Sequence, residues 1–171
     1  MKKKTKPLHE SEVPFPPQVV QTCVAGAQMA RKMAYAPYSE YKVGACVYAQ
    51  NEDGYWAYFR GCNVENASYG MTICAERTAI FNAVVNGFTR IGMMAIATKN
   101  AGMSCGACRQ VEFEFNPNMY VICVGEVGGD VMDYKLSDEL PNAFGPKHLG
   151  KAGPSTGMFE IGWDNFESEP E

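Results

Sequence analysis

Residues 104–110 read SCGACRQ, a stretch in which Cys105 and Cys108 stand three positions apart. The residues that follow, VEFEF, favour a short helix that begins at these cysteines. Backbone N–H groups and the positive dipole at a helix start stabilise thiolates, and two sulfurs at this spacing can reach one ion. A single C-x-x-C motif in a soluble protein is redox-active or inert about half of the time. A closed tetrahedral metal site needs more ligands, yet the chain has no second C-x-x-C, and His9 and His148 lie near its ends.

A third thiol occupies a matching position. Cys74 lies in ICAERTAI, where a second helix is predicted to begin. Three thiolates that leave one coordination position open to water are typical of a catalytic zinc site. Glu76 follows two residues later, too close for comfortable chelation of the same ion but close enough to reach that water. The two cysteine motifs together therefore favour a metal site with a carboxylate placed for general acid–base catalysis.

The rest of the chain alternates strands and helices around these motifs. Helical spacing of apolar residues predicts a first helix, a strand hairpin follows it, and each cysteine motif is predicted to open a helix. The order β-β-α-β-α-β predicts an α/β fold with a mixed sheet and helices packed against it. The expected strands are 42–49, 56–64, 91–98 and 119–127, and the expected helices are 17–35, 73–87 and 105–115.

The length of 171 residues suits one domain. We expect a mobile, Lys- and Pro-rich arm over 1–16, a single domain over 17–150, and a partly disordered extension over 151–171. The apolar residues of the extension are expected to pack on the domain or on a neighbouring subunit, with disorder from Ser168 onward. These residues are Phe159, Ile161, Trp163 and Phe166.

Charge and cysteine content narrow the class of protein. The net charge is −4 and the pI is near 5.3, which weakens any role in binding nucleic acid. No apolar run approaches the roughly 20 residues that a membrane span requires, and no apolar signal core follows the basic start. An odd count of 7 cysteines argues against a disulfide framework. We therefore expect a cytoplasmic protein with reduced thiols, and the cysteines outside the two motifs are expected to be small buried hydrophobes.

Five segments together resemble the small, homotetrameric, three-cysteine zinc type of cytidine deaminase, over about residues 34–149. They read AYAPYSEYKVGA, GCNVENASYG, CAERTAI, CGACRQVEFEF and LPNAF. The resemblance implies a three-layer α-β-α fold with a mixed central sheet. It also implies one zinc ion per subunit, active sites shared between subunits, and pyrimidine salvage. The implied reaction converts cytidine and 2′-deoxycytidine to uridine and 2′-deoxyuridine plus ammonia.

The resemblance also implies roles for residues of the metal site. Cys74, Cys105 and Cys108 would hold the zinc, and Glu76 would transfer protons between water, the base and the leaving amine. Arg77 would offset the negative charge of the ligand sulfurs.

Other residues are implied in substrate binding. Asn63 and Glu65 would hydrogen-bond the ribose 3′-hydroxyl, and a carboxylate there would disfavour nucleotides. Tyr41 stands where the family usually packs a phenylalanine against the pyrimidine. The contacts expected across subunits involve Ala67, Tyr69 and Phe144.

Two positions depart from the family pattern. Ser104 replaces the usual proline before the first cysteine of C-x-x-C, and Glu112 replaces an apolar residue on the helix that follows. Other readings therefore stay open, namely an aminohydrolase acting on a nucleoside antibiotic such as blasticidin S and a non-catalytic protein that kept the zinc fold. A thiol–disulfide oxidoreductase and a nucleic-acid editing role are less well supported.

Overall fold

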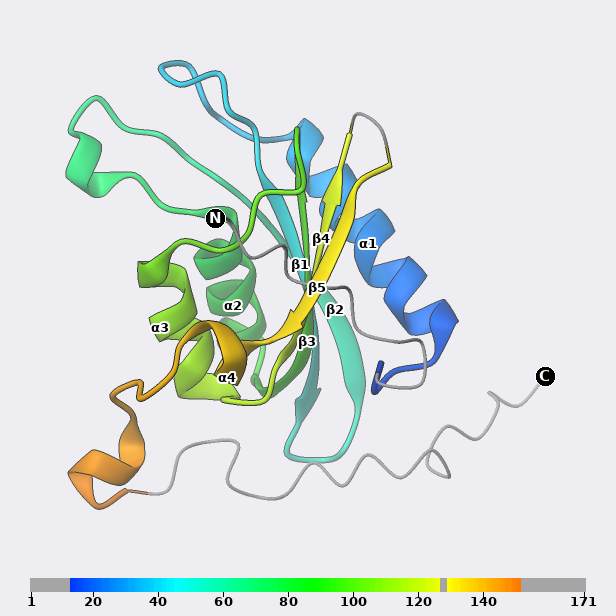
Figure 1. Ribbon diagram of the computed structural model, residues 1–171, viewed down its shortest axis with the longest axis vertical. Helices are drawn as coiled ribbons and strands as arrows, with labels where there is room; N and C mark the ends of the chain where they lie inside the picture. Colours follow the sequence, from blue (N-terminus) through cyan, green and yellow to red (C-terminus); the bar gives the residue numbers. More distant parts are fainter. Residues whose placement is uncertain (1–12, 127–128, 152–171) are drawn as a thin grey trace, which may run out of the picture.

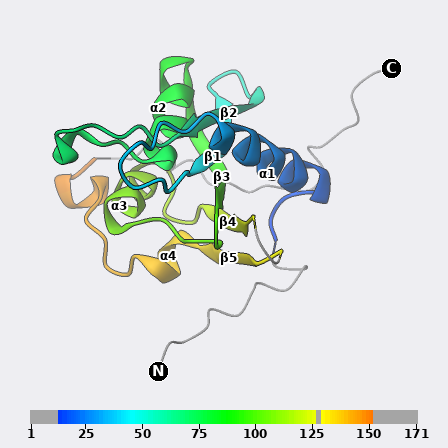
Figure 2. The same ribbon diagram turned by 90° about the horizontal axis from the view of Figure 1, so that it is seen from above.

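Three layers make up the protein in a computed structural model that describes residues 13–126 and 129–151. A five-stranded sheet in the order β2-β1-β3-β4-β5 forms the middle layer. Helix α1 covers one face of the sheet, and helices α2 and α3 cover the other, as Figure 1 shows from the front and Figure 2 from above. The predicted α/β fold with a mixed central sheet is confirmed.

The elements follow one another with short connections. The helices are α1 (Pro17–Lys32), α2 (Ala75–Val85), α3 (Gly106–Phe115) and α4 (Leu136–Glu139), with short 3-10 turns η2 (Tyr69–Met71) and η3 (Pro146–Leu149). The strands are β1 (Gly44–Asn51), β2 (Trp56–Cys62), β3 (Phe88–Thr98), β4 (Tyr120–Gly125) and β5 (Val131–Lys135).

Strand β3 is the centre of the sheet. It pairs antiparallel with β1, which forms the predicted hairpin with β2, and parallel with β4. Helix α3 supplies the connection that a parallel pair requires. Strand β5 closes the other edge by pairing antiparallel with β4.

An apolar cluster fills the space between α1 and the sheet. Helix α1 contributes Cys23 and Ala27, strand β1 contributes Cys46, and Phe15, which precedes α1, is 2% exposed. Residues 1–12 of the predicted arm lie outside the described residues, whereas 13–16 pack on the sheet through Phe15.

Helix α2 packs closely on the other face. Its buried side chains Ala75, Ala79 and Ala83 are small and four positions apart, so they form one stripe along the helix. A Cβ atom on Gly61 of β2 would lie 2.2 Å from the backbone nitrogen of Ala79. The backbone of α2 can approach the sheet this closely because the facing residues are alanine and glycine. This contact fixes where α2 begins relative to the strands.

The last part of the described chain differs from the sequence-based expectation. Strand β5 and helix α4 were not predicted, because five residues that include Asp133 and Lys135 give no clear alternation. Helix α1 ends at Lys32, three residues before the predicted end. The apolar residues of the extension, 152–171, lie outside the described residues. Within the described ranges, no helix has the length and apolar character needed to cross a bilayer.

Candidate metal centre and active site

Two helix starts bring three sulfur atoms together. Cys74 is the N-cap residue of α2, Cys105 is the N-cap residue of α3, and Cys108 lies in the first turn of α3. Their sulfurs all lie within 4.8 Å of one another, and Cys105 Sγ is 3.5 Å from Cys108 Sγ. Sulfurs bound at 2.3 Å to one tetrahedral ion would be roughly 3.8 Å apart. The cluster therefore fits three ligands of a tetrahedral zinc ion.

The surroundings of Cys74 favour its thiolate form, whereas the hydrogen bond with Cys74 raises the pKa of Cys108. A hydrogen bond from the Cys108 thiol and another from the Arg77 guanidinium lower the pKa of Cys74 to about 5, although partial burial opposes them. The Nη2 atom of Arg77 lies 3.5 Å from Cys74 Sγ. Because zinc binds the deprotonated form of cysteine, a thiol that loses its proton this readily is suited to metal binding.

Glu76 stands beside the cluster with its side chain inside the protein. It lies in the first turn of α2 and is 5% exposed. Burial raises the pKa of its carboxyl group, and the negative charge of Cys74 raises it further. A carboxyl group with a raised pKa holds a proton more readily and can return it, a property that general acid–base catalysis uses.

Two cysteines of the cluster, Cys74 and Cys105, border one cavity of about 340 Å³ together with Glu76. Tyr41 and Asn63 also line it, so the cavity is bordered by the start of α2, the segment that leads into β1 and the end of β2. Its volume is at the lower end of the range for small-molecule sites, and suits a ligand of the size of a nucleobase.

Asn63 and Tyr41 form the wall through hydrogen bonds with the protein itself. The Asn63 amide accepts from the Val43 backbone N–H at 2.8 Å and donates to the Tyr41 carbonyl at 3.0 Å. The Tyr41 hydroxyl donates to Asn100 Oδ1 at 2.6 Å. In this structure Asn63 therefore shapes the site, and its predicted bond to ribose remains a prediction.

Glu65 lies in a neighbouring hollow of about 390 Å³. Ser39 and Thr72 line both hollows, so the two are adjacent. The Glu65 carboxylate accepts hydrogen bonds from the Ser39 hydroxyl and from the backbone N–H groups of Tyr38 and Ser39, at 2.7 and 3.2 Å for the latter two. The Ser39 hydroxyl is the main cause that lowers the pKa of Glu65, so this wall of the hollow is negatively charged.

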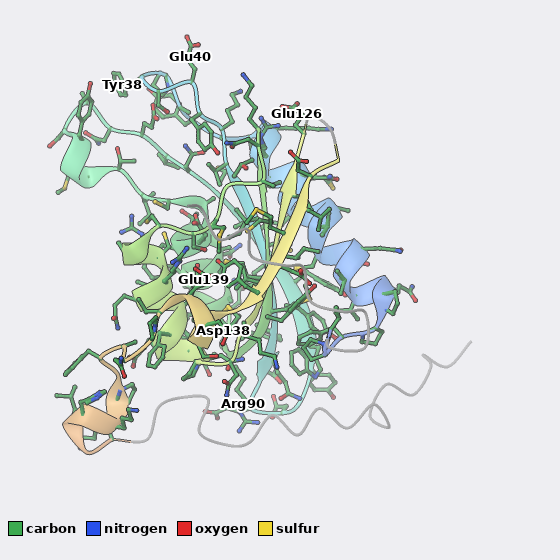
Figure 3. All side chains as sticks on the ribbon, viewed as in Figure 1. Tyr38, Glu40, Arg90, Glu126, Asp138 and Glu139 are labelled. Carbon is green, nitrogen blue, oxygen red and sulfur yellow. The ribbon has the colours of Figure 1, made fainter. Side chains whose placement is uncertain are left out.

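The remaining predicted substrate residues lie outside the cavity beside the cysteines, although Tyr69 lines the hollow that contains Glu65. Ala67 is exposed, and Tyr69 is 76% exposed and in ring contact with Tyr38, which Figure 3 places at the outer end of its loop. Phe144 is 58% exposed and stacks on His148 at 5.2 Å between ring centres. The contacts expected of these residues across subunits stay predictions.

Some residues of the site were not singled out from the sequence. Ser39 and Asn100 lie in loops without periodicity, and nothing in their neighbours marks them as partners of Glu65 and Tyr41. Ser104 and Glu112 were noted separately, but the structure places them in contact, with Ser104 Oγ donating to Glu112 Oε1 at 2.7 Å.

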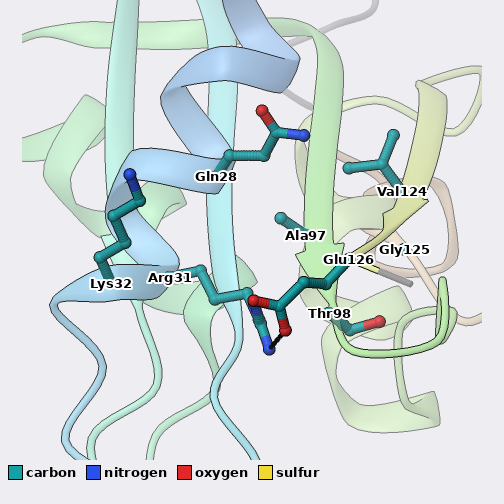
Figure 4. A pocket seen from close by; sticks show the side chains of 8 residues that line it. All are labelled: Gln28, Arg31, Lys32, Ala97, Thr98, Val124, Gly125 and Glu126. Atoms are coloured by element: carbon teal, nitrogen blue, oxygen red, sulfur yellow. Dashed lines mark ion pairs between the residues drawn. The ribbon is translucent and has the colours of Figure 1, made fainter. Parts of the chain in front are cut away.

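A further hollow of about 280 Å³ lies on the α1 side of the sheet (Figure 4). An ion pair between Arg31 and Glu126, with N and O 2.8 Å apart, crosses it. Its walls contain no cysteine or histidine, so they offer no thiolate or imidazole for catalysis or metal binding.

Known proteins share this arrangement. The family model described as "Cytidine and deoxycytidylate deaminase zinc-binding region" matches residues 18–124. A cytidine deaminase of Sporosarcina psychrophila is 39% identical over 135 residues, which cover 78% of this chain and 96% of that protein. A cytidine deaminase of Halalkalibacterium halodurans is 42% identical over 126 residues, covering 72% and 92% respectively.

Comparison with solved structures leads to the same family as comparison of the sequences. The crystal structure of cytidine deaminase from Burkholderia pseudomallei superposes with a TM-score of 0.65 at 42% identity, covering 72% of this chain and 98% of that one. Cytidine deaminase from Mycobacterium tuberculosis gives a TM-score of 0.61 at 35% identity, with 74% and 97% covered. On its sequence, its fold and its cluster of three cysteines, the chain belongs to the cytidine and deoxycytidylate deaminase family.

Proposed function

We propose that the protein is a zinc-dependent hydrolase that converts cytidine and 2′-deoxycytidine to the corresponding uracil nucleosides and ammonia. The observation that carries this proposal is the cavity that Cys74, Cys105 and the buried Glu76 line together, at a cluster of three cysteine sulfurs. A purely structural zinc site has no need of a buried carboxyl group next to an open cavity. The relatives at about 40% identity bear the same activity in their names.

The residues of the chain divide the chemistry among them. Cys74, Cys105 and Cys108 would hold one zinc ion, which when bound activates water by Lewis-acid chemistry. Glu76 would accept a proton from the attacking water and deliver it to ring N3 of the cytosine, and would then pass the proton of the new hydroxyl group at C4 to the departing amine. Arg77 would withdraw charge from the Cys74 sulfur, because three thiolates around a divalent ion leave a net charge of about −1.

The first experiment measures ammonia release from cytidine by protein of known zinc content, beside the variant Glu76→Gln. Glutamine keeps the size of the side chain but cannot carry the proton. We expect it to retain zinc and to lose at least ~10²-fold in kcat. A zinc-loaded parent that leaves cytidine untouched would contradict the proposal, and the same assay with blasticidin S would then identify the antibiotic-directed alternative.

The choice of nucleosides over nucleotides follows from Glu65. Its lowered pKa keeps the carboxylate charged, and a phosphate on the sugar would bring like charges together. We therefore propose that cytidine is a much better substrate than CMP. Comparable values of kcat/KM for the two would refute this part of the proposal.

We further propose a homotetramer in which neighbouring chains complete each site, within a cytoplasmic salvage pathway. Support comes from Tyr69 and Phe144, two exposed aromatic rings that do not line the cavity beside the cysteines of their own chain, although Tyr69 lines the neighbouring Glu65 hollow. Sedimentation equilibrium should give the mass of four chains, and Phe144→Ala should raise KM for cytidine. A fully active monomer would exclude this arrangement.

A further inference from the structure

The two positions that depart from the family pattern form one buried contact. Ser104 is 3% exposed and Glu112 is not exposed at all. The Ser104 hydroxyl donates to Glu112 Oε1 at 2.7 Å, and the Tyr134 hydroxyl of β5 lies 3.3 Å from Ser104 Oγ. Buried polar groups destabilise a fold unless they are hydrogen-bonded to one another, so the serine and the carboxyl group depend on each other.

This contact belongs to a wider network that ties α3 to the end of the described chain. Arg109 of α3 donates to the Glu139 carbonyl at 3.0 Å and pairs with its carboxylate at 3.4 Å. The Arg109 guanidinium also lies 5.9 Å from the centre of the Tyr134 ring. Figure 3 shows Glu139 on α4, where the helix passes in front of α3. Strand β5 and helix α4 thus supply the partners of this network, Tyr134 and Glu139.

The network ends next to a predicted zinc ligand. Ser104 directly precedes Cys105, whose sulfur is exposed, and no side chain caps α3 at that residue. The loop before it contains Ala101 in the left-handed region, with φ of 52°. A proline at position 104 would restrict the backbone by its ring. In this chain the hydrogen bond from Ser104 to Glu112 restricts it instead.

We propose that Glu112 is a positioning residue, which fixes the Cys105 backbone through its hydrogen bond with Ser104 and thereby slows the release of zinc. The inference rests on the proposed zinc site and adds a residue that neither touches the metal nor lines the cavity. Burial raises the pKa of the Glu112 carboxyl group to about 7, in spite of the Ser104 hydroxyl. A neutral glutamine, which also offers an oxygen to Ser104, is therefore the conservative replacement.

The test measures the rate at which the zinc-loaded protein gives up its metal to a colorimetric chelator. Glu112→Leu and Ser104→Ala should each release zinc at least ~10-fold faster, since outer partners of metal ligands typically affect affinity by this much. The double variant should match the faster single variant, because both changes remove the same hydrogen bond. Glu112→Gln should stay within about twofold of the parent, as the hydrogen bond persists.

A matched control separates positioning from general loosening of the helix. Asn116 is buried at the other end of α3, and its side chain donates to the Ile91 carbonyl at 2.9 Å. Asn116→Ala should lower Tm without changing the release rate. Equal acceleration by Asn116→Ala, or parental release from folded Ser104→Ala, would overturn the proposal. If the protein binds zinc but does not deaminate cytidine, the proposed function fails while the release rates still decide this inference.

Discussion

Cys46 and Cys108 are both completely buried, yet only Cys108 belongs to the cluster that can bind a metal ion. Cys46 lies in strand β1 among apolar side chains, and its carbonyl accepts a bond from the Cys23 thiol at 3.1 Å. Cys108 lies in the first turn of α3, with the Cys105 sulfur 3.5 Å away. Burial alone therefore does not decide what a cysteine does.

The difference lies in what surrounds each pair of thiols. Burial raises the pKa of the Cys23 thiol well above its usual value, so this thiol remains protonated, whereas the hydrogen bond with Cys23 lowers the pKa of Cys46 against the effect of burial. Cys74 stands at the start of a helix with a guanidinium beside it, and its pKa falls to about 5. The two faces of one sheet thus hold the same residue type in different settings, a pair enclosed by apolar side chains and a cluster at two helix starts.

Replacing one cysteine from each face should give the largest contrast. Cys108→Ala removes one of three predicted ligands, so we expect zinc to be lost and deamination to fall at least ~10³-fold. Cys46→Ala should cost about 1–2 kcal/mol of stability and leave zinc content unchanged. Zinc analysis, cytidine turnover and urea unfolding check both variants. Full zinc content in Cys108→Ala would remove that residue from the ligand set.

Thiol labelling should show the same contrast without any substitution. In zinc-free protein the exposed Cys105 should react with an alkylating reagent within the native state, whereas Cys23 and Cys46 react only on unfolding, at least ~10³-fold more slowly. Added zinc should protect Cys105. The half-buried Cys62, which was expected to be buried, serves as a control whose rate is independent of zinc. Peptide mass spectrometry identifies the labelled sites.

The buried acid on the α3 side should add a pH dependence. The Glu112 carboxyl group titrates near pH 7 in the folded protein against 4.5 as its reference value, so folding retains a proton that the unfolded chain has lost. The contribution of Glu112 to the free energy of unfolding is therefore largest below pH 4.5, and it is lost as the pH rises through about 7. Between pH 5.5 and 7.5 the parent should lose roughly 2 kcal/mol more than Glu112→Gln. Urea unfolding at both pH values measures the difference, and parallel losses would contradict it.

Two arginines give the smallest expected contrast. Arg77 donates to Cys74 Sγ at 3.5 Å, so Arg77→Ala should lower kcat about tenfold with zinc still bound. Arg60 is exposed and lies 4.0 Å from Met29 Sδ, and Arg60→Ala should leave kcat unchanged. Steady-state kinetics on zinc-loaded protein compares them. Unchanged turnover in Arg77→Ala would mean that the thiolate charge needs no such neutralisation.

The sequence predicted those features that depend on local pattern. The hairpin of β1 and β2 and the helix starts at Cys74 and Cys105 follow from patterns within a short window, and the matching settings of the two cysteine motifs suggested one metal site. Contacts between distant segments could not be read in this way. The burial of Phe15 requires the finished sheet, and the Ser104–Glu112 contact requires β5 beside α3.

Glu65 illustrates the same limit within the site. The resemblance implies that Glu65 and Asn63 bind the sugar, which stays a prediction, but the bonds of Glu65 to Ser39 and of Asn63 to the segment before β1 were not predicted. Loop residues provide these partners, and a loop carries no periodicity from which its path could be inferred.

The central place of β3 has a consequence for the order of events during synthesis. Cys74 precedes this strand and Cys108 follows it, so 34 residues separate the two by position in the chain. At ribosomal rates of 5–20 residues per second, the third sulfur emerges about 2–7 s after the first. Until β3 pairs with β1, the two helix starts have no common support. Zinc capture would then follow sheet assembly, and the metal would stabilise the finished fold by mass action.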